Sequence, residues 1–255
     1  MDVFFSKSEG QTIGSKVCYA PEAESTNTEA TKGLAEKALE GSTYIVDYQT
    51  KGRGQRGNFW ESEQGKNLTF SILVYPNFLP ILDHFYLSKV VANGMVEVLD
   101  SVGIKAKVKW PNDIYVGDKK IAGILIENGL MGANLSHSIW GVGLNVNQTE
   151  FKSNAPNPTS VMLQLGTFHD RNNLLHAVLY AIDGWYAKLK AGCLNEIDSY
   201  YWTSLYRNDG WYWYESEGER FKARIRTIEH TGELTLENEK GELKSFAFKE
   251  VSFII

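Results

Sequence analysis

Cysteine and long apolar runs are scarce in this sequence. Its 255 residues include only two cysteines, Cys18 and Cys193, which lie far apart and form no CxxC pair. This spacing excludes a disulfide framework and a zinc knuckle. No apolar run approaches the roughly 18 residues that a membrane helix needs, and the first residues lack the basic and apolar regions of a signal peptide. We therefore expect a cytoplasmic protein that has no membrane partner.

Positive charge and the common catalytic signatures are also lacking. Lys and Arg number 26 against 31 Asp and Glu, which gives a formal net charge of −5. Because general attraction to nucleic acid is not expected at this balance, any anion-binding site must be local. The five histidines show no HxxxH or HExxH spacing, the serines no GxSxG turn and the glycine loops no GK[ST] ending. We assign no metal ligands, serine nucleophile or Walker A loop.

Hydrophobic periodicity predicts an α+β fold. Helices are expected at 28–40, 84–102, 171–190 and 195–206, and strands at 44–49, 68–74, 104–110, 121–126 and 139–146. Gly41 is the predicted C-cap of the first helix. Strand 68–74 alternates apolar and polar residues and should be half-buried, whereas 121–126 and 139–146 are nearly continuously apolar and should be central.

Glycines and turn signals add a pocket and a second domain to this prediction. Gly123, Gly141 and Gly143 weaken a strand unless another backbone or a ligand approaches closely, so they suggest the floor of a pocket. From about position 208, short extended runs separated by turns predict a small antiparallel barrel of the SH3 type. We therefore expect two domains, 1–207 and 208–255.

A basic glycine loop follows the strand at 44–49. Glycines at 52, 54 and 57 let backbone N–H groups turn toward an anion, and Lys51, Arg53 and Arg56 add three positive charges without an acid among them. Trp60 could help this loop to fold over a bound ligand and exclude water. Taken alone, the motif is equally compatible with a solvated basic loop.

A second segment, at 109–127, reads as a hairpin that carries two lysines. Asn112 and Asp113 stand at a strand end, Gly117 makes the tight turn, and Lys119 and Lys120 follow. Side chains alternate along a strand, so Lys120 reaches the pocket of the glycine at 123 only if a bulge intervenes. The alternative is a hairpin with two exposed lysines.

Together these residues resemble the biotin protein ligases. The resemblance rests on STN at 25–27, YQTKGRGQRGNFW at 48–60, KWPNDIYVGDKKIAGILIE at 109–127, GVGLNVN at 141–147 and the small C-terminal domain. It implies a mixed sheet with flanking helices, related to class II aminoacyl-tRNA synthetases and lipoate ligases, followed by an SH3-like barrel. The implied reaction joins biotin and MgATP to give biotinyl-5′-AMP, and then transfers biotin to a lysine of a biotin carboxyl carrier protein.

The resemblance also implies roles for individual residues. The biotin site would comprise Ser25, Thr26, Asn27, Gln49, Gly52, Arg53, Lys120, Gly123 and Gly141. The ATP and adenylate site would comprise Arg53, Gln55, Arg56, Trp60, Asn112, Lys120 and Asn145. Arg53, Lys120 and Asp113 would be catalytic, because an anionic carboxylate must attack an anionic phosphate. Mg²⁺ would arrive on the ATP phosphates. Asp113 could orient Lys120, assist the metal or receive a proton from the acceptor lysine.

Two departures from the family pattern bear on function. Gln55 stands where the familiar loop, GRGRRG, has arginine. The neutral amide removes one potential charge-assisted contact to the adenylate. The STN motif begins within thirty residues of the start, so we expect no DNA-binding helix-turn-helix and no DNA partner. The alternatives are a lipoate or octanoate ligase and a non-enzymatic biotin-binding regulator. The acceptor protein stays open, and a homodimer is compatible with the resemblance.

Overall fold

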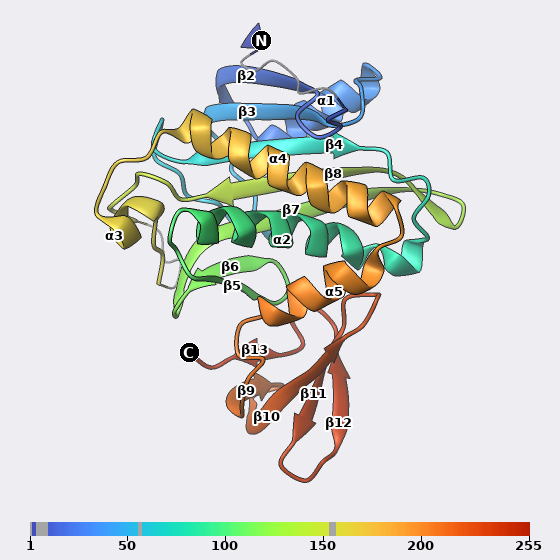
Figure 1. Cartoon of the computed structure of the whole chain (residues 1–255). Helices are drawn as coiled ribbons and strands as arrows, with labels where there is room; N and C mark the ends of the chain where they lie inside the picture. The colour runs from blue at the N-terminus through green and yellow to red at the C-terminus, as the bar shows by residue number, and fades with distance from the viewer. Residues whose placement is uncertain (1, 4–9, 56–57, 153–156) are drawn as a thin grey trace.

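A mixed eight-stranded sheet forms the body of the protein. The computed structural model describes residues 2–3, 10–55, 58–152 and 157–255 (Figure 1). The strand order is β1-β2-β3-β4-β8-β7-β6-β5. The strands are β1 (Asp2–Val3), β2 (Lys16–Ala23), β3 (Ser42–Gln49), β4 (Leu68–Val74), β5 (Ala106–Lys109), β6 (Asp113–Val116), β7 (Lys119–Met131) and β8 (Asn134–Leu144). Because β2 and β3 are parallel and the other neighbours antiparallel, the predicted mixed α+β sheet is confirmed.

Helices cover both faces of this sheet. They are α1 (Thr26–Ala35), the short 3-10 helix η2 (Ile81–Asp83), α2 (Phe85–Ser101), α3 (Val161–Leu165), α4 (Arg171–Lys190) and α5 (Leu194–Thr203). On β8, Trp140 packs on Tyr186 of α4, with ring centroids 5.3 Å apart. Its neighbour Gly141 faces Asn27 of α1 instead. Since neighbouring strand residues point to opposite faces, α1 lies on the face opposite α2 and α4 (Figure 1).

Because helices cover both faces of the sheet, one prediction about strand β4 is corrected. All seven residues of β4 are buried, so the expectation of a half-buried strand was wrong. The polar residues of β4 are buried because they have partners: the Thr69 hydroxyl donates to the Val46 carbonyl at 3.0 Å, and Ser71 contacts residues of α1. The pattern identified the strand but not the helix that covers its polar side.

The predicted helices vary in accuracy. The long helix at 171–190 is confirmed with the predicted bounds, and α2 ends as predicted before Gly103, whose φ is +93°. The first helix is shorter than 28–40, and Gly41 is not its C-cap. Lys37, with φ of +57°, already lies beyond the end of α1 at Ala35, and Gly41 makes a separate turn before β3.

The C-terminal part forms a five-stranded antiparallel sheet. Its order is β12-β11-β10-β9-β13. Its strands are β9 (Tyr212–Ser216), β10 (Glu219–Ile228), β11 (Leu234–Asn238), β12 (Leu243–Phe246) and β13 (Ser252–Phe253). The two residues of β13 escaped the sequence pattern, which gives little signal at that length. Closure into an SH3-like barrel and the boundary at 207/208 remain predictions.

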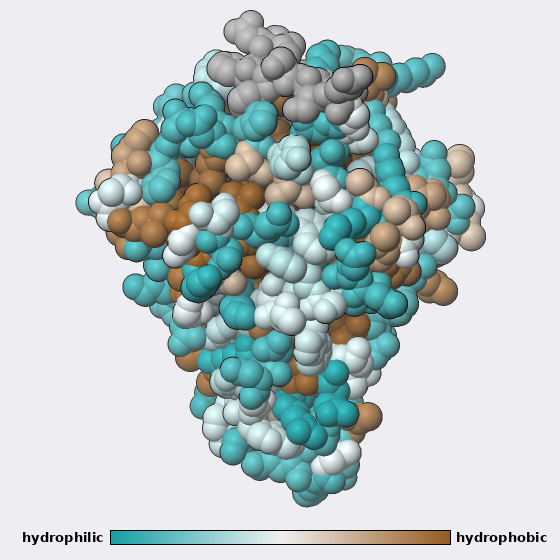
Figure 2. Space-filling model, in the orientation of Figure 1, coloured by the Kyte–Doolittle hydropathy of each residue, from teal (hydrophilic) through white to brown (hydrophobic). Residues whose placement is uncertain are grey.

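Trp110 anchors the C-terminal sheet to the body. Its Nε1 donates to the Gly232 carbonyl at 2.8 Å, and its ring centroid lies 5.4 Å from that of Phe248. Trp110 precedes Asn112 and Asp113 of the candidate site, so the junction also fixes the start of β6. In Figure 2, hydrophilic residues cover much of the C-terminal sheet, and apolar residues gather near α3 and the start of α4. Across the described ranges, no helix is long and apolar enough to cross a membrane.

Candidate functional site

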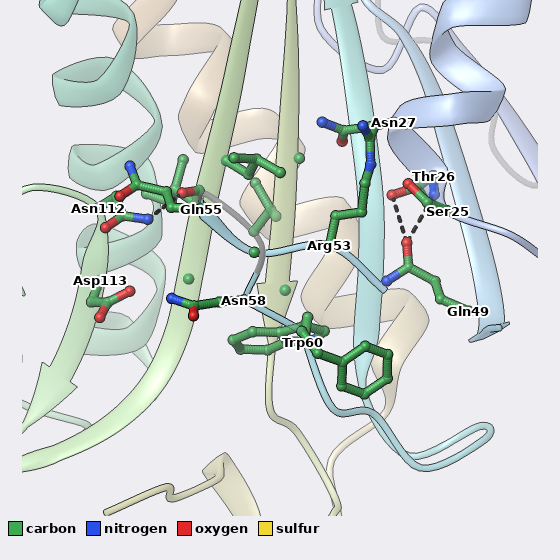
Figure 3. A pocket seen from close by; sticks show the side chains of 18 of the residues that line it. Ser25, Thr26, Asn27, Gln49, Arg53, Gln55, Asn58, Trp60, Asn112 and Asp113 are labelled. Atoms are coloured by element: carbon green, nitrogen blue, oxygen red, sulfur yellow. Dashed lines mark hydrogen bonds between the residues drawn. The ribbon is translucent and has the colours of Figure 1, made fainter. Parts of the chain in front are cut away.

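A cavity of about 150 Å³ opens on the face of the sheet that carries α1 (Figure 3). Most residues that the sequence assigned to ligands line it. They are Ser25, Thr26, Asn27, Gln49, Arg53, Gln55, Trp60, Asn112, Asp113, Lys120, Gly123 and Gly141. These residues come from α1, the end of β3, the glycine loop, β6, β7 and β8. The fold therefore gathers segments that lie far apart in the chain.

The floor of the cavity is made of strand glycines, as the sequence predicted. Gly123, Gly141 and Gly143 all line it. A Cβ atom at Gly141 would lie 2.3 Å from Oδ1 of Asn27, and one at Gly143 would lie 2.3 Å from the indole ring of Trp60. Neither position has room for a larger residue. The indole Nε1 of Trp60 is buried over Gly143 without a hydrogen-bond partner among the described residues.

One end of the cavity carries a network of buried polar side chains. Ser25, Thr26 and Asn27 are each no more than 4% exposed, and Gln49 is 8% exposed. Oε1 of Gln49 accepts from the backbone N–H of Thr26 at 2.8 Å and lies 3.3 Å from its hydroxyl. The Ser71 hydroxyl lies 2.7 Å from Oγ1 of Thr26 and 2.5 Å from Oδ1 of Asn27. This network fixes the side chains before any ligand arrives.

A β-bulge brings Lys120 to the cavity. Pairing of β6 with β7 passes from Ile114–Ala122 to Tyr115–Lys120 and skips Ile121. The extra residue places Lys120 on the same face as Asp113 and Gly123, which are partners in this ladder. The bulge that the sequence analysis required is therefore present. The alternative of two exposed lysines is wrong for Lys120, although Lys119 is exposed.

Lys120 forms an ion pair with Asp113 inside the cavity. Their Nζ and Oδ1 atoms are 2.6 Å apart, and the two side chains are 25% and 19% exposed. Nζ also lies 5.6 Å from the centroid of the Trp60 ring. Of the three roles open to Asp113, this geometry favours the orientation of Lys120.

The surroundings of this ion pair are poorly solvated. Lys109 is the β5 partner of Asp113, and burial lowers the pKa of Lys109 while the Asp113 carboxylate opposes that effect. Burial, and then the Asp113 charge, raise the pKa of Tyr115. Nζ of Lys109 lies 5.1 Å from the Tyr115 ring and 4.9 Å from that of Phe253. Charges at this end of the cavity thus interact in a medium that screens them weakly.

Arg53 has a partner that the sequence analysis did not predict. Its Nη1 and Nη2 donate to Oε1 and Oε2 of Glu127 at 3.2 and 3.1 Å. Nδ2 of Asn27 donates to the same carboxylate at 2.6 Å. Figure 3 shows the Arg53 side chain extending toward Asn27 and away from Asp113.

Two assigned residues that the structure describes, Gly52 and Asn145, lie outside the cavity lining. Gly52 packs against the Trp60 carbonyl, from which a Cβ atom would be only 2.5 Å away. Asn145 is 3% exposed, and its Nδ2 donates to the Thr159 carbonyl at 2.9 Å. Asn145 thus has a structural contact, and its predicted role toward ATP remains a prediction. Arg56 lies outside the described residues.

Sequence reasoning missed several lining residues besides Gly143, which it placed in the pocket floor without a ligand role. They are Asn58, Phe59, Ile124, Leu125 and Val142, whereas Gly54 was already expected to turn its N–H group toward an anion. Alternation along β7 could have found Leu125 and Glu127, since positions 123, 125 and 127 share a face. Within the described part of the chain, no group of three or more His, Cys, Asp or Glu side chains is arranged as a metal site.

Comparisons with known proteins agree with these motifs. The description "Biotin/lipoate A/B protein ligase family" matches residues 19–145. The bifunctional ligase/repressor BirA of Escherichia coli is 35% identical over 167 residues, which are 65% of this chain and 51% of that protein. The chain belongs to the biotin/lipoate A/B protein ligase family. A second family member, the biotin--[acetyl-CoA-carboxylase] ligase of Mycobacterium tuberculosis, is 32% identical over 168 residues, 62% of this chain and 59% of that one. The chain thus spans about half the length of the curated relatives it matches.

Solved structures of the family extend the similarity beyond the matched segment. Biotin protein ligase from Aquifex aeolicus in complex with biotin and ATP has a TM-score of 0.76 and 27% identity. The match covers 92% of this chain and 97% of that chain. The predicted biotin ligase type of fold is therefore confirmed.

Proposed function

We propose that this protein is a biotin protein ligase. It activates biotin with ATP to biotinyl-5′-AMP and then transfers biotin to one lysine of a biotin carboxyl carrier protein. The observation that carries the proposal is the pairing of two features in one cavity: a buried polar network at one end, and the Lys120–Asp113 ion pair at the other. The Aquifex aeolicus enzyme, which has the same fold, was solved with biotin and ATP, and this supports the assignment.

The polar network favours biotin over lipoate and octanoate. A ureido ring offers one carbonyl acceptor and two N–H donors, which match the hydroxyls of Ser25 and Thr26 and the amides of Asn27 and Gln49. A dithiolane ring offers only weak acceptors, and an alkyl chain offers none. Either would form none of these hydrogen bonds, so it would gain less binding free energy than biotin from the same polar groups. No comparable observation favours the lipoate alternative.

The basic side chains suit adenylation. The biotin carboxylate and the α-phosphate of ATP are both anions, so their approach requires fixed positive charge. Lys120 supplies it from a position that Asp113 fixes, and Arg53 supplies it from the glycine loop. Mg²⁺ would enter bound to the ATP phosphates and neutralise part of their charge. Trp60, over Gly143, would help to exclude water from the mixed anhydride.

Several parts of the proposal concern the whole protein. The acceptor is a biotin carboxyl carrier protein by analogy with the named relatives, and the acceptor lysine would attack the carbonyl of the adenylate. The −5 charge favours neither a DNA partner nor an anionic membrane. Cytoplasmic location and a homodimer remain predictions. A purely regulatory biotin binder would not need the Lys120–Asp113 pair.

Exchange of labelled pyrophosphate into ATP tests the adenylation step. We expect exchange that depends on biotin and Mg²⁺, with lipoate and octanoate as parallel substrates that support little or none. The polar network is the reason for this selectivity. Exchange with lipoate but not with biotin would overturn the assignment, and no exchange with any of the three acids would reject a ligase.

Gln55 gives a second prediction. It lines the cavity where the familiar loop has arginine, and a guanidinium there could donate charge-assisted hydrogen bonds to the adenylate phosphate. Gln55→Arg should slow release of biotinyl-5′-AMP about five- to thirtyfold, the equivalent of about 1–2 kcal/mol, with little change in its rate of formation. Stopped-flow release measurements on both proteins check this. Equal or faster release from the arginine variant would place Gln55 outside the contacts that retain the adenylate.

A further inference from the structure

Glu127 joins Asn27 of α1 to Arg53 of the glycine loop. It lies on β7, two residues beyond Leu125 and four beyond Gly123, so its side chain projects from the strand face that lines the cavity. Its carboxylate accepts one hydrogen bond from Asn27 on α1 and two from Arg53 on the glycine loop. Both partners are thus held by a group with no assigned role.

The contact with Asn27 fixes the direction of that amide. Oδ1 of Asn27 lies 2.5 Å from the Ser71 hydroxyl and packs over Gly141, while Nδ2 donates to Glu127. Asn27 is 3% exposed, so its amide cannot exchange these partners for water. Glu127 therefore sets which atom of Asn27 faces which way.

The contact with Arg53 is of a different kind. The two side chains are 44% and 41% exposed, and exposed ion pairs are screened and weak. The two hydrogen bonds orient the Arg53 guanidinium, but the exposed ion pair contributes little free energy. The anionic group of a ligand is less exposed to solvent inside the cavity. It can therefore replace the Glu127 carboxylate as the partner of Arg53.

We propose that Glu127 is a positioning residue that holds Arg53 before the ligand binds and releases it to the anionic group of the ligand. The inference rests on the proposed function. Figure 3 shows Arg53 pointing toward Asn27, whereas Asp113, the ion-pair partner of Lys120, lies at the other end of the cavity. The ligand carboxylate, and later the adenylate phosphate, replaces the Glu127 carboxylate as the partner of Arg53. Glu127 keeps its hydrogen bond to Asn27 throughout, so the network of buried polar side chains is unchanged.

The proposal predicts that Glu127 competes with the charge of the ligand and not with its ring. Glu127→Gln keeps an acceptor for Asn27 but removes the bidentate partner of Arg53. The variant should bind biotin about two- to fivefold more tightly, as expected when a weak exposed ion pair no longer has to be broken. Biotinol, the neutral alcohol analogue, should bind with unchanged affinity. Isothermal titration calorimetry on the full chain measures both.

Two controls separate this role from simpler ones. In an Arg53→Ala background, Glu127→Gln should not change biotin affinity, whereas relief of general charge repulsion would persist there. Glu215→Gln is a matched control, because Glu215 is also 41% exposed and pairs with an arginine, Arg220, far from the cavity. It should leave both affinities unchanged.

The binding results for biotin and biotinol decide whether Glu127 has this role. Tighter biotin binding that is absent for biotinol and absent without Arg53 supports the proposal. Unchanged or weaker biotin binding, an equal change for biotinol, or an effect that persists in the Arg53→Ala background overturns it. Failure of the unmodified protein to bind biotin would instead reject the proposed function.

Discussion

Replacing Lys120 with alanine should slow the adenylation of biotin about a hundredfold, which corresponds to about 3 kcal/mol. The side chain would meet the carboxylate and the α-phosphate in the transition state, where negative charge is concentrated. Its loss also leaves Asp113, which is 19% exposed, as an unpaired negative charge facing two anionic reactants. Single-turnover formation of biotinyl-5′-AMP, followed by rapid quench, measures the effect.

Lys119→Ala provides the matched control for this prediction. Lys119 precedes Lys120 on β7 but is exposed, because the bulge turns only Lys120 toward Asp113. The control should adenylate biotin at the normal rate, and both variants should keep the circular dichroism spectrum of the unmodified protein. Near-normal adenylation by Lys120→Ala would show that the ion pair is structural.

Gly141→Ala should weaken biotin binding about ten- to hundredfold. A Cβ atom there would lie 2.3 Å from Oδ1 of Asn27, and Asn27 cannot retreat because Ser71 and Glu127 hold its amide. The amide must rotate or shift, so buried polar groups lose partners at about 1–3 kcal/mol each. Titration calorimetry with biotin measures the loss.

The control for this substitution is Gly184→Ala on the exposed side of α4. A Cβ atom at Gly184 would meet nothing within 4 Å, so the variant should bind biotin normally. Normal binding by Gly141→Ala would mean that Asn27 does not contact the ureido ring of biotin.

The pocket floor could be predicted because a glycine inside a buried strand is costly unless something needs the space. Gly123, Gly141 and Gly143 carried that information in the sequence, and the structure fills the space above two of them with Trp60. The position of Lys120 could be predicted only conditionally. Its bulge depends on a distant segment: the Lys120 N–H donates to Asn157 O, and Thr159 N–H donates to Lys120 O, each at 2.8 Å. No local pattern reveals such a partner.

Burial of β4 and the role of Glu127 escaped prediction for related reasons. The alternation of Thr69 and Ser71 with apolar residues is the usual signature of a solvated face, and only the packing of α1 turns that face inward. A glutamate at the end of an apolar strand looks like an ordinary surface charge. Its significance appears only when Asn27 and Arg53, from two other segments, are found on the same carboxylate.

Intact-mass spectrometry of a biotin carboxyl carrier protein tests the central claim most directly. The carrier is incubated with this protein, ATP, Mg²⁺ and equal amounts of biotin and lipoate, and its mass gain identifies the acid attached. The account predicts a single biotinyl adduct, mapped by peptide sequencing to one lysine, and none when ATP is omitted. A lipoyl adduct, or an unmodified carrier under conditions in which biotin-dependent pyrophosphate exchange proceeds, would contradict it.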